Sequence, residues 1–152
     1  MIGCAVAQEE ITLGGAQTTG FSLDPDLAVA VDVTHATDAP GIDKKEQGDH
    51  PLGSGPVIGR GSTLNHRVCQ LLVDVAEAEG IEHTIQANGR YTGTDADSLQ
   101  LARGGIPCGL VSLPLRYMHS SVEMVQLSDV ENAIKLLVAF AGRLEADAEF
   151  GR

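Results

Sequence analysis

Residues 27–33 read LAVAVDV, a run that is apolar as far as Asp32. A short continuous apolar run is typical of a strand in the core of a protein. Residues 109–113 form a second strong run of this kind. Weaker strands are predicted at residues 3–7, 56–60, 84–87 and 122–126. The chain therefore offers several short strands from which a sheet can form.

Helical patterns lie between these runs. Apolar residues recur at helical spacing over residues 64–79 and predict a helix that Gly80 ends. Ser128 and Glu131 form a capping box at the start of another such pattern, which predicts the last helix. A shorter helix is predicted over residues 95–103. Strands that alternate with helices indicate an α/β fold.

The composition limits the classes of function. A chain of 152 residues, of which 43% are hydrophobic, is sufficient for one globular domain. A formal net charge of −11 leaves no basic stripe for a phosphate backbone, so nucleic acid is not an expected partner. No apolar run approaches the ~20 residues that cross a bilayer, and no secretory signal is visible, so no membrane partner is expected. Three cysteines without paired spacing indicate reduced thiols and predict a cytoplasmic protein.

Acidic residues and a histidine follow the predicted strands. Glu9 and Glu10 come directly after residues 3–7, Asp32 ends the LAVAVDV run, and His119 follows residues 109–113. Ligands of α/β proteins bind beyond the carboxyl ends of the strands, so parallel strands would bring these four groups to one edge of the sheet. Carboxylates and imidazole are zinc ligands, and one of two adjacent glutamates can bind metal while its neighbour accepts a proton.

Each of these residues also has a plainer explanation. Adjacent glutamates are usually a solvated charge pair. Asp32 in an apolar strand needs either a cation or several hydrogen bonds, because an unpaired buried carboxylate is costly. His119 taken alone is more often structural or exposed, and His35 lies close enough in sequence to line the same site without binding a metal.

Two glycine-containing segments are further candidates. Residues 91–96, YTGTDA, join a strand to a helix, and exposed backbone N–H groups there could receive a substrate oxygen, although Asp95 could also be a simple helix cap. Residues 53–56, GSGP, form either a connecting turn or a close approach of backbone to a ligand. They end a segment rich in Asp, Gly, Pro and Lys, residues 38–56, that is predicted to be a surface loop, with His50 inside it.

Taken together, these segments resemble a known family, the glutamyl aminopeptidase and tetrahedral aminopeptidase family. Its members are cytosolic exopeptidases with two co-catalytic zinc or cobalt ions, and some relatives carry the label endoglucanase. The matching stretches occur in family order between about residues 3 and 142. They are AQEEITLGGA, AVAVDVTHATDAPG, LGSGPVIGRGSTLN, YTGTDADSLQLARGGIPCGLVSLPLRYMHSSVE and LSDVENAIKLL. The resemblance implies a mixed, mostly parallel sheet flanked by helices, as in zinc exopeptidases.

The resemblance also implies a role for individual residues at a metal centre. Glu9 corresponds to the general base and acid. Glu10 and His119 correspond to ligands of one metal, and Asp32 to a ligand of the other. The complete family site holds two divalent ions, zinc or cobalt, and a single ion is expected for this chain alone.

Two further pairs correspond to the surroundings of that centre. Thr94 and Asp95 resemble a wall of the substrate pocket, and Arg60 and Gly61 resemble the segment that follows the glycine turn near the site. All four are therefore predicted to bind substrate. Gly14 stands where arginine is common in the family, a departure that affects no catalytic role.

The resemblance covers only one part of a family member. The family's first metal-binding histidine, its bridging aspartate and its dimerisation domain precede the segment that matches QEE, and none of them is in this sequence. Residues 1–144 are therefore expected to be the C-terminal part of an incomplete metallopeptidase catalytic domain, and residues 145–152 a frayed tail. The family forms homo-oligomers, but with the dimerisation domain absent a homo-oligomer is not expected here.

The predicted function is metal-dependent aminopeptidase activity. The enzyme would remove N-terminal residues from short peptides through a metal-activated water, with Glu9 as the base. One alternative is a truncated, catalytically inactive remnant of such an enzyme. A second is an endoglucanase-type glycoside hydrolase, which would need two carboxylates flanking a sugar and no metal.

Overall fold

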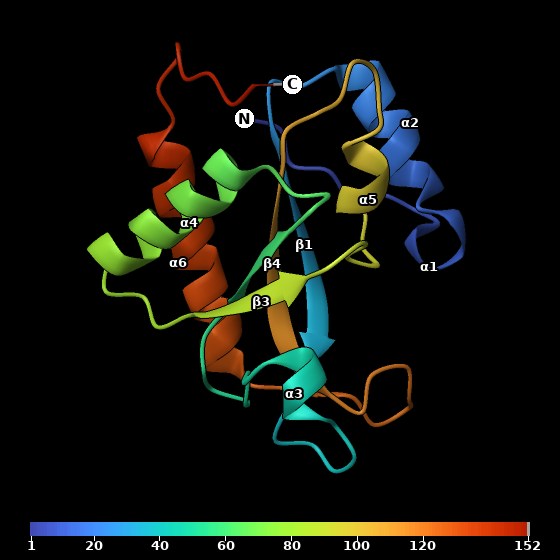
Figure 1. Cartoon of the computed structure of the whole chain (residues 1–152), viewed down its shortest axis with the longest axis vertical. Coiled ribbons are helices and arrows are strands. Elements are labelled where there is room, and N and C mark those ends of the chain that lie inside the picture. The colour runs from blue at the N-terminus through green and yellow to red at the C-terminus, as the bar shows by residue number, and fades with distance from the viewer. Residues whose placement is uncertain (152) are drawn as a thin grey trace.

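The computed structural model describes residues 1–151, and within them the chain folds into a mixed sheet between two layers of helices (Figure 1). The strands are β1 (Ala28–His35), β2 (Val57–Gly61), β3 (Thr84–Asn88), β4 (Cys108–Arg116) and β5 (Met124–Val125). The helices are α1 (Glu9–Thr12), α2 (Gly14–Leu23), α3 (Lys44–Gln47), α4 (His66–Ala78), α5 (Ala96–Leu99) and α6 (Leu127–Arg143). The predicted α/β fold with a mixed, mostly parallel sheet is confirmed. None of these helices is long and apolar enough to cross a membrane.

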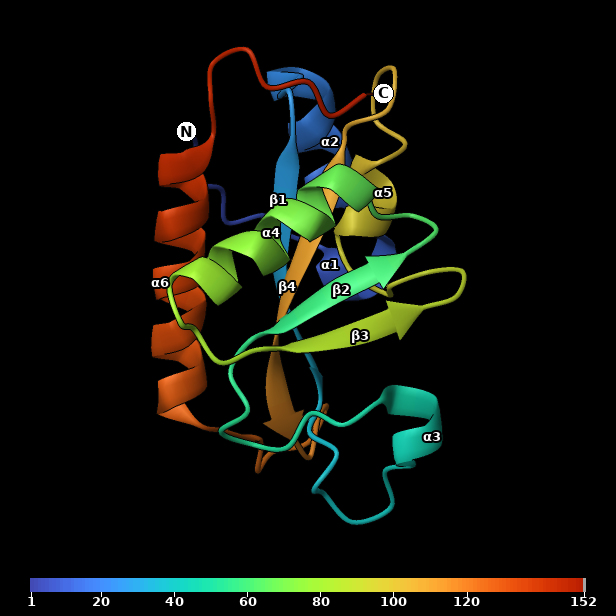
Figure 2. The same cartoon turned by 60° about the vertical axis from the view of Figure 1, so that its left-hand side comes forward.

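The sheet is ordered β1-β4-β2-β3, and the short β5 also pairs with β4. β1 runs parallel to β4 along its whole length, from Ala28 opposite Cys108 to His35 opposite Leu115. β2 and β3 are parallel to each other, whereas β2 meets β4 in antiparallel orientation. The two strong apolar runs of the sequence are thus neighbours, and their carboxyl ends lie at the same edge, near α3 (Figures 1 and 2).

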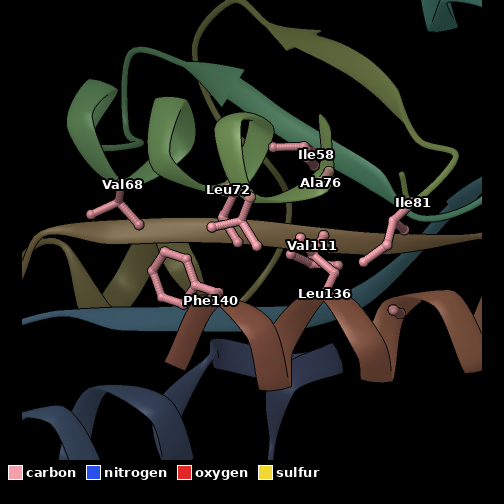
Figure 3. Packing of buried hydrophobic residues seen from close by; sticks show 10 residues of the cluster. Ile58, Val68, Leu72, Ala76, Ile81, Val111, Leu136 and Phe140 are labelled. Atoms are coloured by element: carbon pink, nitrogen blue, oxygen red, sulfur yellow. The ribbon is translucent and has the colours of Figure 1, made fainter. Parts of the chain in front are cut away.

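β4 lies between β1 and β2 in the sheet, and both of its faces are covered by helices. α4 and α6 lie on one face of the sheet, and α2 and α5 lie on the other (Figure 1). Val111 packs with Leu72 of α4 and Leu136 of α6, whereas its neighbour Leu110 belongs to the cluster on the opposite face (Figure 3). A strand that is buried on both sides is continuously apolar rather than alternating, which is why residues 109–113 were recognisable in the sequence.

The N-terminal region differs from its prediction. Residues 3–7 form no strand, and the chain instead makes α1 and α2, neither of which the sequence predicted. α2 reads GGAQTTGFSL and buries only Ala16 and Gly20, so it has no apolar stripe to detect. Gly20 allows close packing here, since a Cβ on it would lie 2.9 Å from a methyl carbon of Leu99.

Two further local predictions were wrong in part. The last helix begins at Leu127, with Gln126 as its N-cap, and no side chain caps it, so Ser128 and Glu131 do not form the predicted capping box. The predicted surface loop contains the one-turn helix α3 and also the side chain of His50, of which only 1% is exposed.

The C-terminal tail after Leu144 contains no helix or strand within the described residues. Its backbone nevertheless contacts the start of α4, because the Asn65 side-chain amide donates to the carbonyl of Phe150 and the Arg67 guanidinium donates to that of Glu149, both at 2.9 Å. Phe150 also packs against the core on the α4 and α6 face.

Candidate active site

A cavity of about 490 Å³ opens where β1 and β4 end. Its walls come from α1, the second half of β1, β3, the loop before α5 and the loop after β4. Five of the residues that the sequence analysis predicted for the site line this cavity: Glu9, Glu10, Asp32, Thr94 and His119. His35 lines it too, as proposed from its position in the sequence. Segments far apart in the chain are therefore brought together at the expected edge of the sheet.

Glu9 and Glu10 form the single helical turn α1. The residues on either side, Gln8 with φ 66° and Leu13 with φ 56°, adopt left-handed backbone conformations, which are unfavourable for side chains larger than glycine. The turn is held in place by a hydrogen bond of 3.0 Å from the Gly15 N–H to the Ala7 carbonyl. Gly15 is required for this contact, because a Cβ at that position would lie only 2.2 Å from the same oxygen.

His119 lies in a second strained segment. It has φ 61°, and Tyr117, just after β4, has φ 60°. The backbone N–H of His119 donates to a carboxylate oxygen of Glu123 at 2.7 Å, which stabilises the loop. The imidazole Nε2 lies 3.4 Å from the carboxylate of Glu10, and both side chains are mostly exposed. Left-handed residues on both sides of this contact are consistent with a functional site, where backbone strain is often concentrated.

Asp32 is half-buried on β1, opposite Ser112 of β4. One carboxylate oxygen accepts the N–H of Val33 at 2.7 Å. Burial raises the pKa of Asp32, the Val33 hydrogen bond opposes this rise, and the nearby Asp95 and Glu10 carboxylates add to it. The single hydrogen bond therefore does not compensate the cost of placing this charge in an apolar strand.

Glu9 experiences the same electrostatic environment. Burial raises its pKa, and the negative charges of Asp32, Glu10 and Asp95 raise it further, while His119 lowers it. The carboxylates of Glu9, Glu10, Asp32 and Asp95 are thus close enough to influence one another. A glutamate whose pKa is raised holds a proton more readily, a property that suits a residue that acts as both general base and general acid.

These residues provide only part of the set of ligands that a divalent cation needs. Carboxylate and imidazole groups have the right chemistry for zinc or cobalt, and Glu10 and His119 are already in contact. Nevertheless, among residues 1–151 no three acidic, histidine or cysteine side chains are grouped closely enough to hold a metal ion. Asp32 shares the cavity without joining the Glu10 and His119 pair.

Two backbone N–H groups of the loop before α5 are hydrogen-bonded to the side chain of Asp97. The carboxylate of Asp97 accepts the backbone N–H groups of Thr92 at 2.9 Å and Gly93 at 2.8 Å, so these donors are already occupied. Asp95 precedes α5 but makes no capping hydrogen bond, and its Oδ1 atom is buried without a partner among the described residues. Burial raises the pKa of Asp95. The interpretation of Asp95 as a simple helix cap is therefore not supported.

Arg60 and Gly61 lie on β2 and do not line the cavity. The Arg60 guanidinium contacts Nε2 of His66 at 3.1 Å and donates to the side-chain oxygen of Gln70 at 3.0 Å. Gly61 is in close contact with the backbone of Asn88 on β3, where a Cβ would be 2.2 Å from the carbonyl oxygen. Their predicted role in substrate binding stays a prediction.

Most of the uncharged polar residues of the cavity were not predicted from the sequence. These are Thr12, Thr34, Gln47, Gln86, Asn88 and Ser112. A signal existed for two of them, because Gln86 and Asn88 alternate with the exposed Ile85 and Ala87 along β3 and so share one face of the strand. No local pattern marked Gln47, which the fold brings to the cavity from the segment predicted to be a surface loop.

The sequence matches a known family and is similar to individual relatives. Residues 1–136 match the family described as M42 glutamyl aminopeptidase. The chain is 38% identical over 141 residues to a lysyl aminopeptidase of Pyrococcus furiosus, an alignment that covers 93% of this chain and 40% of the relative.

Solved structures give the same result. A TET aminopeptidase from a marine sediment archaeon of the Thaumarchaeota superimposes with a TM-score of 0.85 at 32% identity, covering 94% of this chain and 40% of the other. The TET1 peptidase of Pyrococcus horikoshii, which can assemble into a tetrahedron or a large octahedral shell, has a TM-score of 0.74 at 30% identity, with coverages of 91% and 40%. The chain thus spans about 40% of the length of the relatives it matches.

Proposed function

Because the chain belongs to the M42 glutamyl aminopeptidase family, we propose that it carries part of the active site of a metal-dependent aminopeptidase that acts on short peptides. The observation that supports this most directly is the meeting of Glu9, Glu10, Asp32 and His119 in one cavity. These residues come from α1, β1 and the loop after β4, so only the fold brings them together. A cavity of about 490 Å³ is within the range of pockets that bind small molecules.

Glu9 is proposed to move the proton. It lines the cavity beside Glu10 without an ion-pair partner of its own among the described residues, and its pKa is raised by burial and by three neighbouring carboxylates. A glutamate in this state can accept a proton from the attacking water and donate it to the departing amine. The turn that carries Glu9 lies between Gln8 and Leu13, which both have left-handed backbone conformations.

Glu10 and His119 are the residues proposed to hold a divalent cation, with Asp32 contributing from β1. When bound, such an ion polarises the scissile carbonyl and so favours attack by water. In support of this, a carboxylate oxygen of Glu10 and Nε2 of His119 lie 3.4 Å apart, and both carboxylate and imidazole groups are zinc ligands.

We also propose that the protein functions in the cytoplasm. Cys69 and Cys108 are buried free thiols, and burial raises the pKa of both, that of Cys108 to about 12, so they behave as inert apolar groups. This is compatible with a reducing cytoplasm. Homo-oligomers occur among the relatives, since the TET1 peptidase of Pyrococcus horikoshii can assemble into a tetrahedron or a large octahedral shell.

The test is hydrolysis of aminoacyl p-nitroanilides by the purified chain with Zn²⁺ or Co²⁺, compared with the Glu9→Gln variant. We expect Glu9→Gln to lower kcat by about 10²-fold to 10⁴-fold, the usual contribution of a general base. The matched control is Glu131→Gln on the exposed surface of α6, which should not change the rate. A folded chain that hydrolyses nothing with either ion would favour the inactive remnant instead, and full activity of Glu9→Gln would rule out its role as the base.

A further inference from the structure

The cavity has a second wall that carries no charge. Thr34 of β1, Gln47 of α3 and Gln86 of β3 line it from three different elements. We propose that Gln86 and Gln47 form a subsite that binds the side-chain carbonyl of an N-terminal glutamine or asparagine. This inference rests on the proposed aminopeptidase function and specifies its substrate class.

Gln86 is oriented by β1. The Thr34 hydroxyl donates to Oε1 of Gln86 at 3.1 Å, so the carbonyl of this amide faces β1 and its NH₂ group faces away. The acceptor that this NH₂ group reaches is Oε1 of Gln47, at 3.5 Å. A distance of 3.5 Å is long for an N–H···O hydrogen bond, whose usual length is about 2.9–3.0 Å. The N–H donors of Gln86 are therefore only weakly engaged and can be given up to a ligand.

Gln47 is held at the cavity by the buried His50. Nε2 of His50 lies 2.8 Å from the backbone carbonyl of Gln47, and Nδ1 lies 2.8 Å from the hydroxyl of Thr84. Because a carbonyl can only accept, Nε2 carries the proton, and Nδ1 accepts from Thr84. Thr84 precedes Gln86 by two residues on β3, so both side chains are on the same face of the strand. His50 is thus a positioning residue that fixes the end of α3 against the strand carrying Gln86.

The balance of donors and acceptors determines what this wall can bind. The side-chain carbonyls of Gln86 and Gln47 each already accept a hydrogen bond. Of the four N–H groups of the two amides, one makes the long 3.5 Å contact, and the other three are available to a ligand. The wall therefore favours a ligand with an acceptor oxygen. A lysine or arginine side chain offers none, and an apolar side chain would leave the donors unpaired, which costs binding free energy.

Charge distinguishes the acidic from the neutral substrate side chains that offer an acceptor oxygen. Glu9, Glu10 and Asp32 line the same cavity, and repulsion from these carboxylates disfavours a substrate that brings a fourth. A neutral carbonyl avoids this repulsion and still satisfies the amide donors. Glutamine and asparagine are the common residues whose side chains end in such a group, so they are the expected N-terminal residues.

Binding can be measured without turnover. Side-chain amide resonances of the ¹⁵N-labelled protein would be followed by NMR during titration with L-glutaminamide, L-leucinamide, L-lysinamide and the α-amide of L-glutamate. We expect the Gln86 and Gln47 amide resonances to shift with L-glutaminamide, and its Kd to be about tenfold lower than that of L-leucinamide, which corresponds to one or two neutral hydrogen bonds. Equal affinity for all four amides would overturn the proposal.

The matched variants are Gln86→Met, which keeps the length of the side chain and removes the amide, and Gln17→Met on the exposed surface of α2. Gln86→Met should remove the tenfold preference for L-glutaminamide over L-leucinamide, and Gln17→Met should keep it. If Gln86→Met does not fold, Gln47→Met provides the same comparison. A preference that survives removal of either amide contradicts the proposal.

Kinetics separate this inference from the proposed function. In the hydrolysis assay, the ratio of kcat/KM for the glutaminyl and leucyl p-nitroanilides should fall about tenfold in Gln86→Met. Selective binding of L-glutaminamide by a chain that hydrolyses nothing would support the subsite while contradicting the aminopeptidase activity. Hydrolysis without any preference for glutamine would support the activity and overturn the subsite.

Discussion

The carboxylate of Asp129 accepts two backbone hydrogen bonds from the turn that precedes β2, from the Gly53 N–H at 2.8 Å and the Gly55 N–H at 2.9 Å. Asp129 lies in the first turn of α6 and is completely buried. Gly53 and Gly55 both have positive φ, and a Cβ on Gly55 would lie 1.8 Å from the carbonyl oxygen of Glu82. The GSGP segment is therefore a connecting turn fixed by α6, and it does not line the cavity.

Asp129→Ala should destabilise the protein. The substitution leaves the buried Gly55 N–H without its acceptor and also removes the acceptor of the more exposed Gly53 N–H, so we expect the free energy of unfolding to fall by about 1–3 kcal/mol. Urea denaturation followed by circular dichroism measures the change. The control is Ser128→Ala, whose side chain is exposed and should matter by less than about 0.5 kcal/mol. If Ser128→Ala lowered the free energy of unfolding more than Asp129→Ala does, the capping box predicted from the sequence would be supported instead.

Asp129 illustrates what a sequence pattern can and cannot show. The apolar periodicity of α6 was clear, but the capping box predicted from Ser128 and Glu131 does not form. The Asp129 carboxylate instead accepts from the glycine turn, a contact between distant segments that no local pattern shows. Asp32 and His119 were predictable because they lie on or after strands whose apolar runs are local signals, whereas Glu9 and Glu10 follow residues 3–7, which form no strand. Gln47 and Gln86 were not predictable, since their meeting depends on His50 packing against β3, a contact between distant segments.

Stability should depend on the protonation of His50. Burial lowers the pKa of His50 below its ordinary value of 6.5, against smaller opposing effects from the Gln47 carbonyl and Asp49. Above pH 6.5 the imidazole is neutral in both the folded and the unfolded chain, so its hydrogen bonds contribute in full. As the pH falls below 6.5, the unfolded chain takes up a proton that the folded chain resists, and the free energy of unfolding decreases until the folded pKa is passed.

The measurement is the free energy of unfolding between pH 5 and pH 7.5 for the wild type, His50→Gln and His66→Gln. His50→Gln should lose about 1–3 kcal/mol at pH 7.5, because its hydrogen bonds are disrupted, and should show a flatter dependence on pH. His66 is exposed at the start of α4, and its variant should keep the slope of the wild type. An unchanged slope in His50→Gln would mean that other groups control acid sensitivity.

Removing the charge of Asp32 should stabilise the chain in the absence of metal. The pKa of Asp32 is raised above its ordinary value of 3.8, chiefly by burial. Below pH 3.8 the carboxyl is neutral in both states and has no charge to desolvate. As the pH rises above 3.8 the unfolded chain ionises more readily than the folded chain, so the folded state loses relative stability until the folded pKa is passed.

Asp32→Asn should therefore have a higher urea midpoint than the wild type at pH 7 in EDTA, and the difference should disappear below pH 3.8. An asparagine oxygen can still accept the Val33 N–H, so the backbone hydrogen bond is kept. Asp26→Asn, at an exposed position before β1, is the control and should have little effect. A lower midpoint for Asp32→Asn at pH 7 would show that the charge is stabilised by contacts other than those described here.

Arg60 and Gly61 distinguish the role implied by the family resemblance from the role implied by the contacts. Gly61 pairs with Asn88 where β2 meets β3, and backbone rather than a flexible side chain occupies the space that a Cβ would need. Gly61→Ala should thus lower the free energy of unfolding by about 1–3 kcal/mol, as overpacking does elsewhere. Arg60 is exposed and points to α4, so Arg60→Ala should change stability by less than about 0.5 kcal/mol. In the hydrolysis assay, a KM unchanged by Arg60→Ala would assign this pair to the structure of the sheet. A KM raised tenfold would instead support substrate binding, and would require that β2 or α4 moves toward the cavity when peptide is bound.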